Sequence, residues 1–353
     1  MSFIKNAWYC AGFSSDLTSN AELYTIKILD EPLVLYRTSA GVVALNDRCP
    51  HRFAPLSKGK LCEQAIQCGY HGLVFDATGK CIKNPHGPIP PAAKVKAYPV
   101  LERHSALWVW MGEPANADPA QLPDFGSTEE GPRCARVIGR LHIKANYQLV
   151  TDNLLDLSHV PFLHPFLANA GPPPEGFSAK IKTDVVGSTV HAINEFAYMP
   201  TSEFYRMLWE RGPAPPTCDM RANMRWNAPA LMLLDTGATP HGESQDMGPT
   251  SMQGHWLTPE SELTTHYFWA VGRDRFVGDP AMSERVRAGV DSAFRSEDEP
   301  MIEAVQSRMG GSDLWAHEPL LFATDTAAVR ARRIVEKMIS SEQKGRVSDE
   351  ALS

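Results

Sequence analysis

The stretch CPHRFAPLSKGKLCEQAIQCGYHG, residues 49–72, holds two short motifs of the same make-up. Cys49 and His51 form the first motif, and sixteen residues separate it from the second, Cys68 and His71. Each motif can sit on one loop and offer a thiolate and an imidazole to a common centre, and the proline and glycine residues beside them favour tight loops. The pattern predicts a metal centre with two sulfur and two nitrogen ligands.

Two kinds of metal centre use this donor set. A cluster of two irons, with two thiolates on one iron and two histidines on the other, is the Rieske arrangement. A structural zinc bound by two cysteines and two histidines is the alternative, but its cysteines usually form a pair about two to four residues apart. Here each motif supplies one cysteine and one histidine. The spacing therefore favours a Rieske [2Fe–2S] cluster.

The two motifs lie in a β-rich part of the chain. Short runs of β-branched and aromatic residues alternate there with Gly, Asp, Asn and Pro, without a long helical period. We expect an all-β sandwich domain over residues 1–115 and a Pro- and Gly-rich linker over residues 116–135. Residues 136–345 mix strand-like runs with helical periods, which predicts an α+β domain with an antiparallel sheet. Residues 346–353 are expected to form a frayed tail. The clearest strand-like runs of the second domain are 182–196, 230–238 and 265–272.

A second group of polar residues occurs in TDNLLDLSHVPFLHP, residues 151–165. A helix is predicted over 147–159, and on it Asn153, Asp156 and His159 share one face beside apolar neighbours. Polar atoms on such a face need partners. The segment is therefore a candidate for a second metal site.

A proline separates the two histidines of this segment. Pro161 disfavours a continuous helix, and the break lets His164 turn back toward His159. Two histidines and one carboxylate form the facial triad of non-haem Fe(II) oxygenases, because oxygen and substrate need the vacant coordination positions. A helix predicted further along the chain offers Asp298 on its apolar stripe, and the neighbouring Glu297 remains the alternative third ligand.

These motifs resemble those of a known family. CPHRFAPLS (49–57) followed by CGYHGLVFD (68–76) resembles the Rieske motif of the ring-hydroxylating oxygenases, and NAWY (6–9) resembles their single-component branch. The resemblance covers nearly the whole chain and implies a helix-grip-like catalytic domain whose sheet closes around an aromatic-sized pocket. It implies that the Rieske cluster is held by Cys49, His51, Cys68 and His71.

The resemblance extends to the second site. Asp156, His159 and His164 match the family's motif, and SEDEPMIEA, residues 296–304, matches the stretch that supplies the third iron ligand. It implies His159, His164 and Asp298 as the ligands of a mononuclear Fe²⁺. Asp156 is then expected to bridge a Rieske histidine of one subunit and an iron histidine of its neighbour. The implied assembly is a head-to-tail homotrimer.

Two further residues are candidates for the active site. By resemblance, His255 sits where relatives place a polar residue that contacts the substrate, and Asn153 is expected to support the iron site. Arg206, Arg221 and Arg225 lie in segments near the expected pocket, but we do not place them in the site, because surface arginines are commoner.

The composition limits the partners. The chain has 34 Lys and Arg against 41 Asp and Glu, a net charge of −7, and no basic block, so we expect neither nucleic acid nor a membrane surface as partner. Because we find neither a signal-like start nor a long apolar run, we expect a cytoplasmic protein. No G-x-G-x-x-G motif occurs, so electrons are expected from an NAD(P)H-dependent reductase, with or without a separate ferredoxin.

The two sites predict the terminal oxygenase component of a Rieske monooxygenase that hydroxylates a small aromatic substrate with O2. The expected reaction is O-demethylation of a methoxybenzoate with formaldehyde release, because hydroxylation of an O-methyl group gives an unstable hemiacetal. Methyl hydroxylation of an aryl sulfonate or carboxylate, and ring hydroxylation, are the alternatives. An electron carrier with only a Rieske domain and a zinc-stabilised binding module are rivals of other classes, and the predicted facial triad argues against both.

Overall fold

The computed structural model describes residues 3–18, 22–164, 166–167 and 174–350, without the side chains of the last five. The chain forms two compact units, Met1–Leu122 and Pro123–Ser353. The predicted linker, residues 116–135, spans this division and contains short 3₁₀ turns, with Phe125 and Thr128 buried. Its role as a linker stays a prediction.

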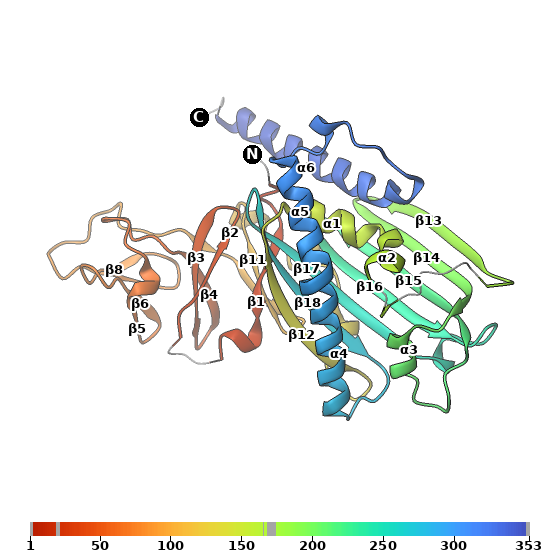
Figure 1. Ribbon diagram of the computed structural model, residues 1–353. Helices are drawn as coiled ribbons and strands as arrows, with labels where there is room; N and C mark the ends of the chain where they lie inside the picture. Colours follow the sequence, from red (N-terminus) through yellow and green to blue (C-terminus); the bar gives the residue numbers. More distant parts are fainter. Residues whose placement is uncertain (1–2, 19–21, 165, 168–173, 351–353) are drawn as a thin grey trace. The chain divides into compact units, whose positions relative to one another are not determined.

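Three antiparallel sheets form the N-terminal unit (Figure 1). The first has the order β1-β11-β10, made of Trp8–Phe13, Ala106–Trp110 and Val100–Arg103. The second has the order β2-β3-β4-β9, made of Tyr24–Ile28, Glu31–Thr38, Gly41–Asn46 and Ala97–Tyr98. The third has the order β5-β6-β7-β8, made of Lys60–Cys62, Ala65–Gln67, Val74–Phe75 and Cys81–Lys83. The predicted all-β class of this unit is confirmed.

One hydrophobic cluster of the N-terminal unit joins the second and third sheets to the metal motifs. It includes Val34 and Tyr36 of β3 and Phe75 of β7, all fully buried. Cys49 and Cys68 belong to the same cluster. Burial of these apolar side chains thus fixes the loops that carry the predicted cluster ligands.

A seven-stranded antiparallel sheet forms the centre of the C-terminal unit (Figure 1). Its order is β12-β18-β17-β16-β15-β14-β13, and in that order its strands are Ala135–Ile143, Thr264–Arg273, Thr250–Ser261, Leu231–Thr239, Thr217–Asn227, Thr189–Pro200 and Ser178–Val186. Because the side chains of each strand alternate between the two faces of the sheet, one face can pack against the helices.

A long helix lies along this sheet, with shorter helices beside it (Figure 1). It consists of α4, Pro280–Ser292, a π-helical segment, Ala293–Asp298, and α5, Glu299–Met309. The remaining helices are α1, Tyr147–Leu155, α2, Val160–Leu163, α3, Glu203–Met207, and α6, Thr326–Glu350. The predicted α+β class is confirmed. Residues 346–350, expected as part of a frayed tail, continue α6, and 351–353 lie outside the described residues.

Helix α4 begins with a capping aspartate followed by a proline. The side chain of Asp279 accepts hydrogen bonds from the amides of Ala281 and Met282, and Pro280 takes the first helical position, where its missing N–H needs no partner. Among the described residues, no helix combines the length and the apolar character that crossing a bilayer requires.

Candidate metal centres and active site

The two Cys-His motifs lie on loops with the same hydrogen-bond pattern. In each loop the cysteine amide donates to the carbonyl five residues on, and the amide four residues on donates back to the cysteine carbonyl, at 2.8–3.1 Å. The fourth position after Cys49 is Phe53 (φ 59°), and the fourth after Cys68 is Gly72 (φ 73°). Both have the left-handed backbone that closes a tight turn, which glycine adopts most easily. The structure thus contains the tight loops that the sequence predicts.

The four predicted cluster ligands form two close pairs, one of thiols and one of imidazoles. Cys49 and Cys68 are each 2% exposed, whereas His51 and His71 reach the surface with ring centroids 4.4 Å apart. The backbone amides of His51 and Arg52 hydrogen-bond the Cys49 thiol. Two buried thiols and two adjacent imidazoles fit a Rieske cluster, and amide hydrogen bonds to sulfur are among the features that set its potential.

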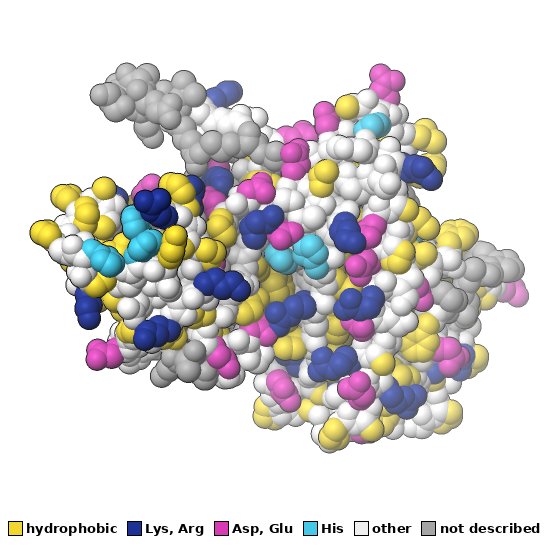
Figure 2. Space-filling view, turned by 60° about the vertical axis from the view of Figure 1, so that its left-hand side comes forward, with side chains coloured by type: hydrophobic (Ala, Val, Ile, Leu, Met, Phe, Trp, Pro, Cys, Tyr) yellow, Lys and Arg dark blue, Asp and Glu magenta, His cyan; other side chains and the backbone are white. Residues whose placement is uncertain are grey.

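A third histidine adjoins these loops and was not predicted. His86 Nε2 lies 3.0 Å from the carbonyl oxygen of His71, and their ring centroids are 6.2 Å apart. Figure 2 shows histidine side chains gathered among apolar ones on the surface of this unit. In the sequence, His86 stands in a loop rich in proline and glycine, as do the two motifs. This shared context is the signal that could have indicated it.

The helix before the second site ends earlier than predicted. Helix α1 stops at Leu155, because Asp156 leaves the helical region (φ −114°, ψ 98°). The Asp156 carboxylate accepts a hydrogen bond from the amide of Ser158 (2.9 Å) and caps a 3₁₀ turn, Leu157–His159. The prediction of a break at Pro161 is wrong, because Pro161 lies in the first turn of α2, where proline is tolerated. The chain turns at Asp156 instead.

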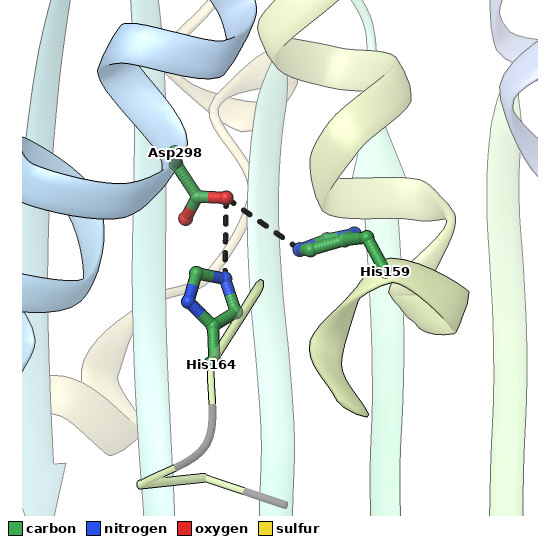
Figure 3. Close-up of side chains that lie close together, drawn as sticks. All are labelled: His159, His164 and Asp298. Carbon is green, nitrogen blue, oxygen red and sulfur yellow. Dashed lines mark ion pairs between the residues drawn. The ribbon is translucent and has the colours of Figure 1, made fainter. Parts of the chain in front are cut away.

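This turn brings together the three predicted iron ligands, His159, His164 and Asp298 (Figure 3). One donor atom of each lies within 4.8 Å of the others. Asp298 Oδ1 is 3.2 Å from His164 Nε2 and 3.5 Å from His159 Nε2. His164 and Asp298 are buried. Two imidazoles and one carboxylate converging on one point fit a facial-triad iron site.

The second nitrogen of each ring is held by another hydrogen bond. His159 Nδ1 lies 2.8 Å from the carbonyl oxygen of Asp156, and His164 Nδ1 lies 2.5 Å from the Glu297 carboxylate. Metal-binding histidines usually donate their other N–H to such groups. Glu297, left open by the sequence as an alternative ligand, therefore lies on the far side of His164 from Asp298.

The π-helical segment sets the position of Asp298. At its end the amide of Glu299 bonds to the carbonyl of Phe294, five residues back instead of four. Such π segments often occur at functional sites. The Asn153 amide donates to Asp298 Oδ1 (3.0 Å), so the residue that the sequence names as a support contacts the expected ligand directly.

The three donors border a mostly apolar cavity of about 160 Å³. An apolar cavity of ~150 Å³ holds a benzene ring, so the space suits one aromatic ring. The residues that β15, β16 and β17 contribute to its wall are Met220, Ala222, Met224, Leu234, Thr236, Gln253 and His255, and the long helix adds Gly289, Val290, Ala293 and Phe294. The hydroxyl of Tyr205, another wall residue, hydrogen-bonds that of Thr236.

His255, which the family resemblance predicts to contact the substrate, lies in this wall. It is 1% exposed, and its Nδ1 lies 2.7 Å from the hydroxyl of Tyr267. Its Nε2 has no protein hydrogen-bond partner among the described residues. Burial lowers the pKa of His255 to about 3, so the ring is neutral near pH 7. A neutral ring with a spare nitrogen beside a cavity can hold a polar group of a ligand.

Sequence reasoning missed two residues near His255. Gln253 lies two positions earlier on β17, and the alternation of strand side chains places it on the same face. Tyr267, on the neighbouring strand β18, gave no signal beyond its place in a strand-like run. His266, a second histidine on these strands, packs its ring against His142 and is not among the described wall residues.

Comparison with known proteins gives the site its context. A model of the Rieske [2Fe–2S] domain matches residues 7–99, and a model of the vanillate O-demethylase oxygenase C-terminal domain matches residues 143–341. The chain belongs to the Rieske non-haem iron oxygenases. This Rieske oxygenase is 37% identical to the oxygenase component of dicamba O-demethylase from Stenotrophomonas maltophilia over 343 residues, 96% of this chain and 98% of that protein.

Solved structures agree with this assignment. Dicamba monooxygenase bound to 3,6-dichlorosalicylic acid has 35% sequence identity and a TM-score of 0.87, with 97% of this chain and 99% of that one covered. A structure of dicamba monooxygenase with non-haem iron and dicamba has 34% identity and a TM-score of 0.82, with 98% and 99% covered. The fold predicted from the sequence is therefore confirmed over both units.

The family membership decides between the rival interpretations. The protein is the oxygenase component of a Rieske monooxygenase, and its cofactors are a Rieske [2Fe–2S] cluster and a mononuclear iron. The Rieske match excludes the zinc alternative, and the catalytic domain excludes a Rieske electron carrier. Oxygenase components of this kind work with a separate reductase or ferredoxin that supplies the electrons.

Proposed function

We propose that this Rieske oxygenase hydroxylates the methyl group of an aromatic methyl ether and so releases formaldehyde. The cavity of about 160 Å³ beside His159, His164 and Asp298 carries the proposal, because it holds one ring next to the three donors. The names of the matching C-terminal domain and of the dicamba enzyme support O-demethylation as the reaction.

The proposed ligands follow from the donor positions. Cys49, Cys68, His51 and His71 hold the Rieske cluster, and His159, His164 and Asp298 hold the mononuclear iron. Glu297 and the Asp156 carbonyl orient the two iron histidines, and Asn153 orients the Asp298 carboxylate.

When bound, the cluster supplies single electrons and the mononuclear iron activates O2 beside the substrate. The chain's own residues prepare the reaction: apolar side chains of β15 and β16 hold the ring and exclude water, and His255 orients its polar substituent. One oxygen atom enters a methyl C–H bond and gives a hemiacetal, which breaks down to formaldehyde and a phenol. The other oxygen atom is reduced to water by two electrons from NAD(P)H, together with two protons.

Asp156 lies next to one of the proposed iron ligands. Its carbonyl holds His159, and its carboxylate caps a partly exposed turn. We propose that the carboxylate reaches a Rieske histidine of a neighbouring subunit in a homotrimer, which gives the electrons a path between the centres. A cytoplasmic location completes the proposal, and none of the seven cysteines forms a disulfide, which agrees with a reducing compartment.

The test is formaldehyde release by the purified protein with a compatible reductase and NADH. Methoxybenzoates, methoxybenzamides and toluenesulfonate are offered in turn, and O2 uptake is followed with product analysis. One formaldehyde per O2 from a methoxy compound is expected, and His159→Ala serves as the inactive control. O2 uptake with a benzylic alcohol or a ring-hydroxylated product, and without formaldehyde, would select one of the alternatives.

A further inference from the structure

One residue of the C-terminal helix α6 reaches helix α1, which lies beside it and precedes the iron turn (Figure 1). Arg332 of α6 is 3% exposed, and its Nε donates to both carboxylate oxygens of Asp152 on α1, at 3.0 and 2.9 Å. Its Nη2 donates to the same carboxylate (2.5 Å), and its Nη1 donates to the side-chain oxygen of Gln148 (2.8 Å). One guanidinium thus binds two successive turns of α1.

The side chains around Arg332 let α6 approach α1 closely. The buried apolar residues of the described part of α6 are small: Ala327, Ala328, Ala331 and Val335. A guanidinium buried among them needs an opposite charge, which Asp152 provides. Once its desolvation is included, such a pair often stabilises a fold no more than an apolar pair of the same volume. The distinctive contribution of the pair is therefore the direction of its bonds.

Two hydrogen bonds connect Asp152 to a proposed iron ligand. The carbonyl of Asp152 accepts a hydrogen bond from the amide of Asp156 (3.0 Å), which closes the last turn of α1. The carbonyl of Asp156 in turn holds His159 Nδ1 (2.8 Å). A displacement of Asp152 therefore displaces the turn on which His159 stands.

The two ends of α1 are held differently. At its beginning, the Gln306 side chain of α5 accepts a hydrogen bond from the amide of Asn146, whose own side chain caps the helix. At its end, Asn153 contacts Asp298 and so belongs to the site that has to be positioned. The other described side chains of the last turn, residues 152–155, are Asp152 and two leucines. The polar side-chain contact that holds this end from outside the iron site is thus the contact with Arg332.

We propose that Arg332 is a positioning residue, which through Asp152 holds the end of α1 and with it the turn that carries Asp156 and His159. Arg332 is not among the described residues of the cavity wall, so it acts on the geometry of the site and not on the substrate directly. A displacement of about 1 Å at a reacting group can lower a rate by a large factor, even when its cause lies far from the chemistry. The inference rests on the proposed iron ligands.

A double substitution to apolar residues removes the directional bonds without leaving a buried charge. In Asp152→Leu/Arg332→Met we expect the affinity for iron to fall about tenfold, as for other groups that orient metal ligands. The Rieske absorption should remain, and the unfolding temperature should stay close to that of the unsubstituted protein, because an apolar pair fills the same space. Iron affinity is measured by competition with a chelator. Arg333→Met, at the next and exposed position of α6, is the matched control and should bind iron normally.

A conservative variant tests the geometry without changing the charge. Lysine has one ammonium group in place of the planar fork, so Arg332→Lys cannot hold Asp152 and Gln148 through separate nitrogens. We expect an iron affinity between those of the unsubstituted protein and the double variant. We also expect a changed electron paramagnetic resonance spectrum of the ferrous protein with nitric oxide. This spectrum reports the ligand arrangement at the iron, which a loss of stability alone would not change.

Two results would overturn the inference. The first is a normal iron affinity and an unchanged spectrum in Arg332→Lys, whether or not the double variant folds. The second is a joint loss of iron, Rieske absorption and unfolding temperature in Arg332→Lys, which would show that the pair acts on stability alone.

Failure of the proposed iron ligands would look different. Normal iron binding by His159→Ala would remove that ligand set, and the role of Arg332 with it. Loss of iron in His159→Ala, together with normal iron binding in both Arg332 variants, would leave the ligand set standing and remove only the role of Arg332.

Discussion

The two candidate metal centres differ in how the chain assembles them. The Rieske donors all come from residues 49–71, on two loops with one hydrogen-bond pattern. The iron donors come from a turn after α1, the end of α2 and a π-helical segment about 130 residues further along the chain. The first centre depends on local turns, and the second depends on the packing of helices against one sheet.

This difference predicts different sensitivities. Each Rieske loop closes on its own backbone hydrogen bonds, so a change of one donor leaves the other loop in place. At the iron centre, Asp156, Asn153 and Glu297 come from separate turns and each touches a proposed ligand. Substitution of these supporting residues should therefore affect the iron centre in a graded way.

The largest expected effect is the loss of a donor at either centre. Cys68→Ser should abolish the visible absorption of the Rieske cluster, and His159→Ala should keep that absorption but lose the mononuclear iron. Turnover should be undetectable in both, because each centre is needed. Absorption spectra with iron analysis check the outcome. Retained Rieske absorption in Cys68→Ser would show that this cysteine is not a ligand.

Asp156→Asn should come next, because it tests the link between the centres. Asparagine can keep the cap on the 3₁₀ turn, whereas the bridging charge is lost. We expect both metals to stay bound and turnover to fall about 100-fold, as for other residues that orient metal ligands. Single-turnover kinetics of reduced protein measure the electron transfer directly. Full activity of this variant would contradict the bridging role.

Glu297→Gln should weaken the iron centre without affecting the cluster. The amide still contacts His164 Nδ1 but no longer provides the negative charge that strengthens this imidazole as a ligand. We expect iron affinity to fall about 30-fold, measured by competition with a chelator. Glu284→Gln, with a side chain 76% exposed on α4, is the matched control and should bind iron normally. Equal iron affinity of the two variants would show that Glu297 does not support His164.

Asn153→Ala should have the smallest effect of this series. The Asp298 carboxylate loses one hydrogen bond but keeps its place on the π-helical segment. We expect a reduction of about tenfold in kcat, because hydrogen bonds to charged groups contribute of this order. The Rieske absorption should be unchanged. A loss as large as that of His159→Ala would instead assign Asn153 a role as important as a ligand.

The same contrast explains what the sequence could predict. Cys49, His51, Cys68 and His71 are recognisable because their spacing lies within two loops that fold locally. The β class of the first unit and the two iron histidines also follow from short segments. An α-helical period of apolar residues predicted that Asp298 points inward, although the helix is a π segment there. The prediction holds because its neighbours on the apolar stripe still face the sheet.

Features that depend on strand register could not be predicted. The cavity wall consists of alternating residues of β15, β16 and β17, and only one of these strands was evident as a run in the sequence. Pairing between strands decides on which face of the sheet Arg221 lies. It also decides that Gln253 lies beside His255 in the cavity. The position of the turn at Asp156 was missed because a carboxylate cap competed with the more conspicuous proline.

The π-helical segment has a consequence for the design and comparison of such proteins. A single five-residue step gives this long helix one residue more than an uninterrupted α-helix of the same turns. An alignment that treats 280–309 as one regular helix would place the residues after Ser292 out of phase by about 100° with the side chains they replace. A helix grafted from another scaffold would therefore need one inserted residue between Ala293 and Asp298 to present its carboxylate to the two histidines.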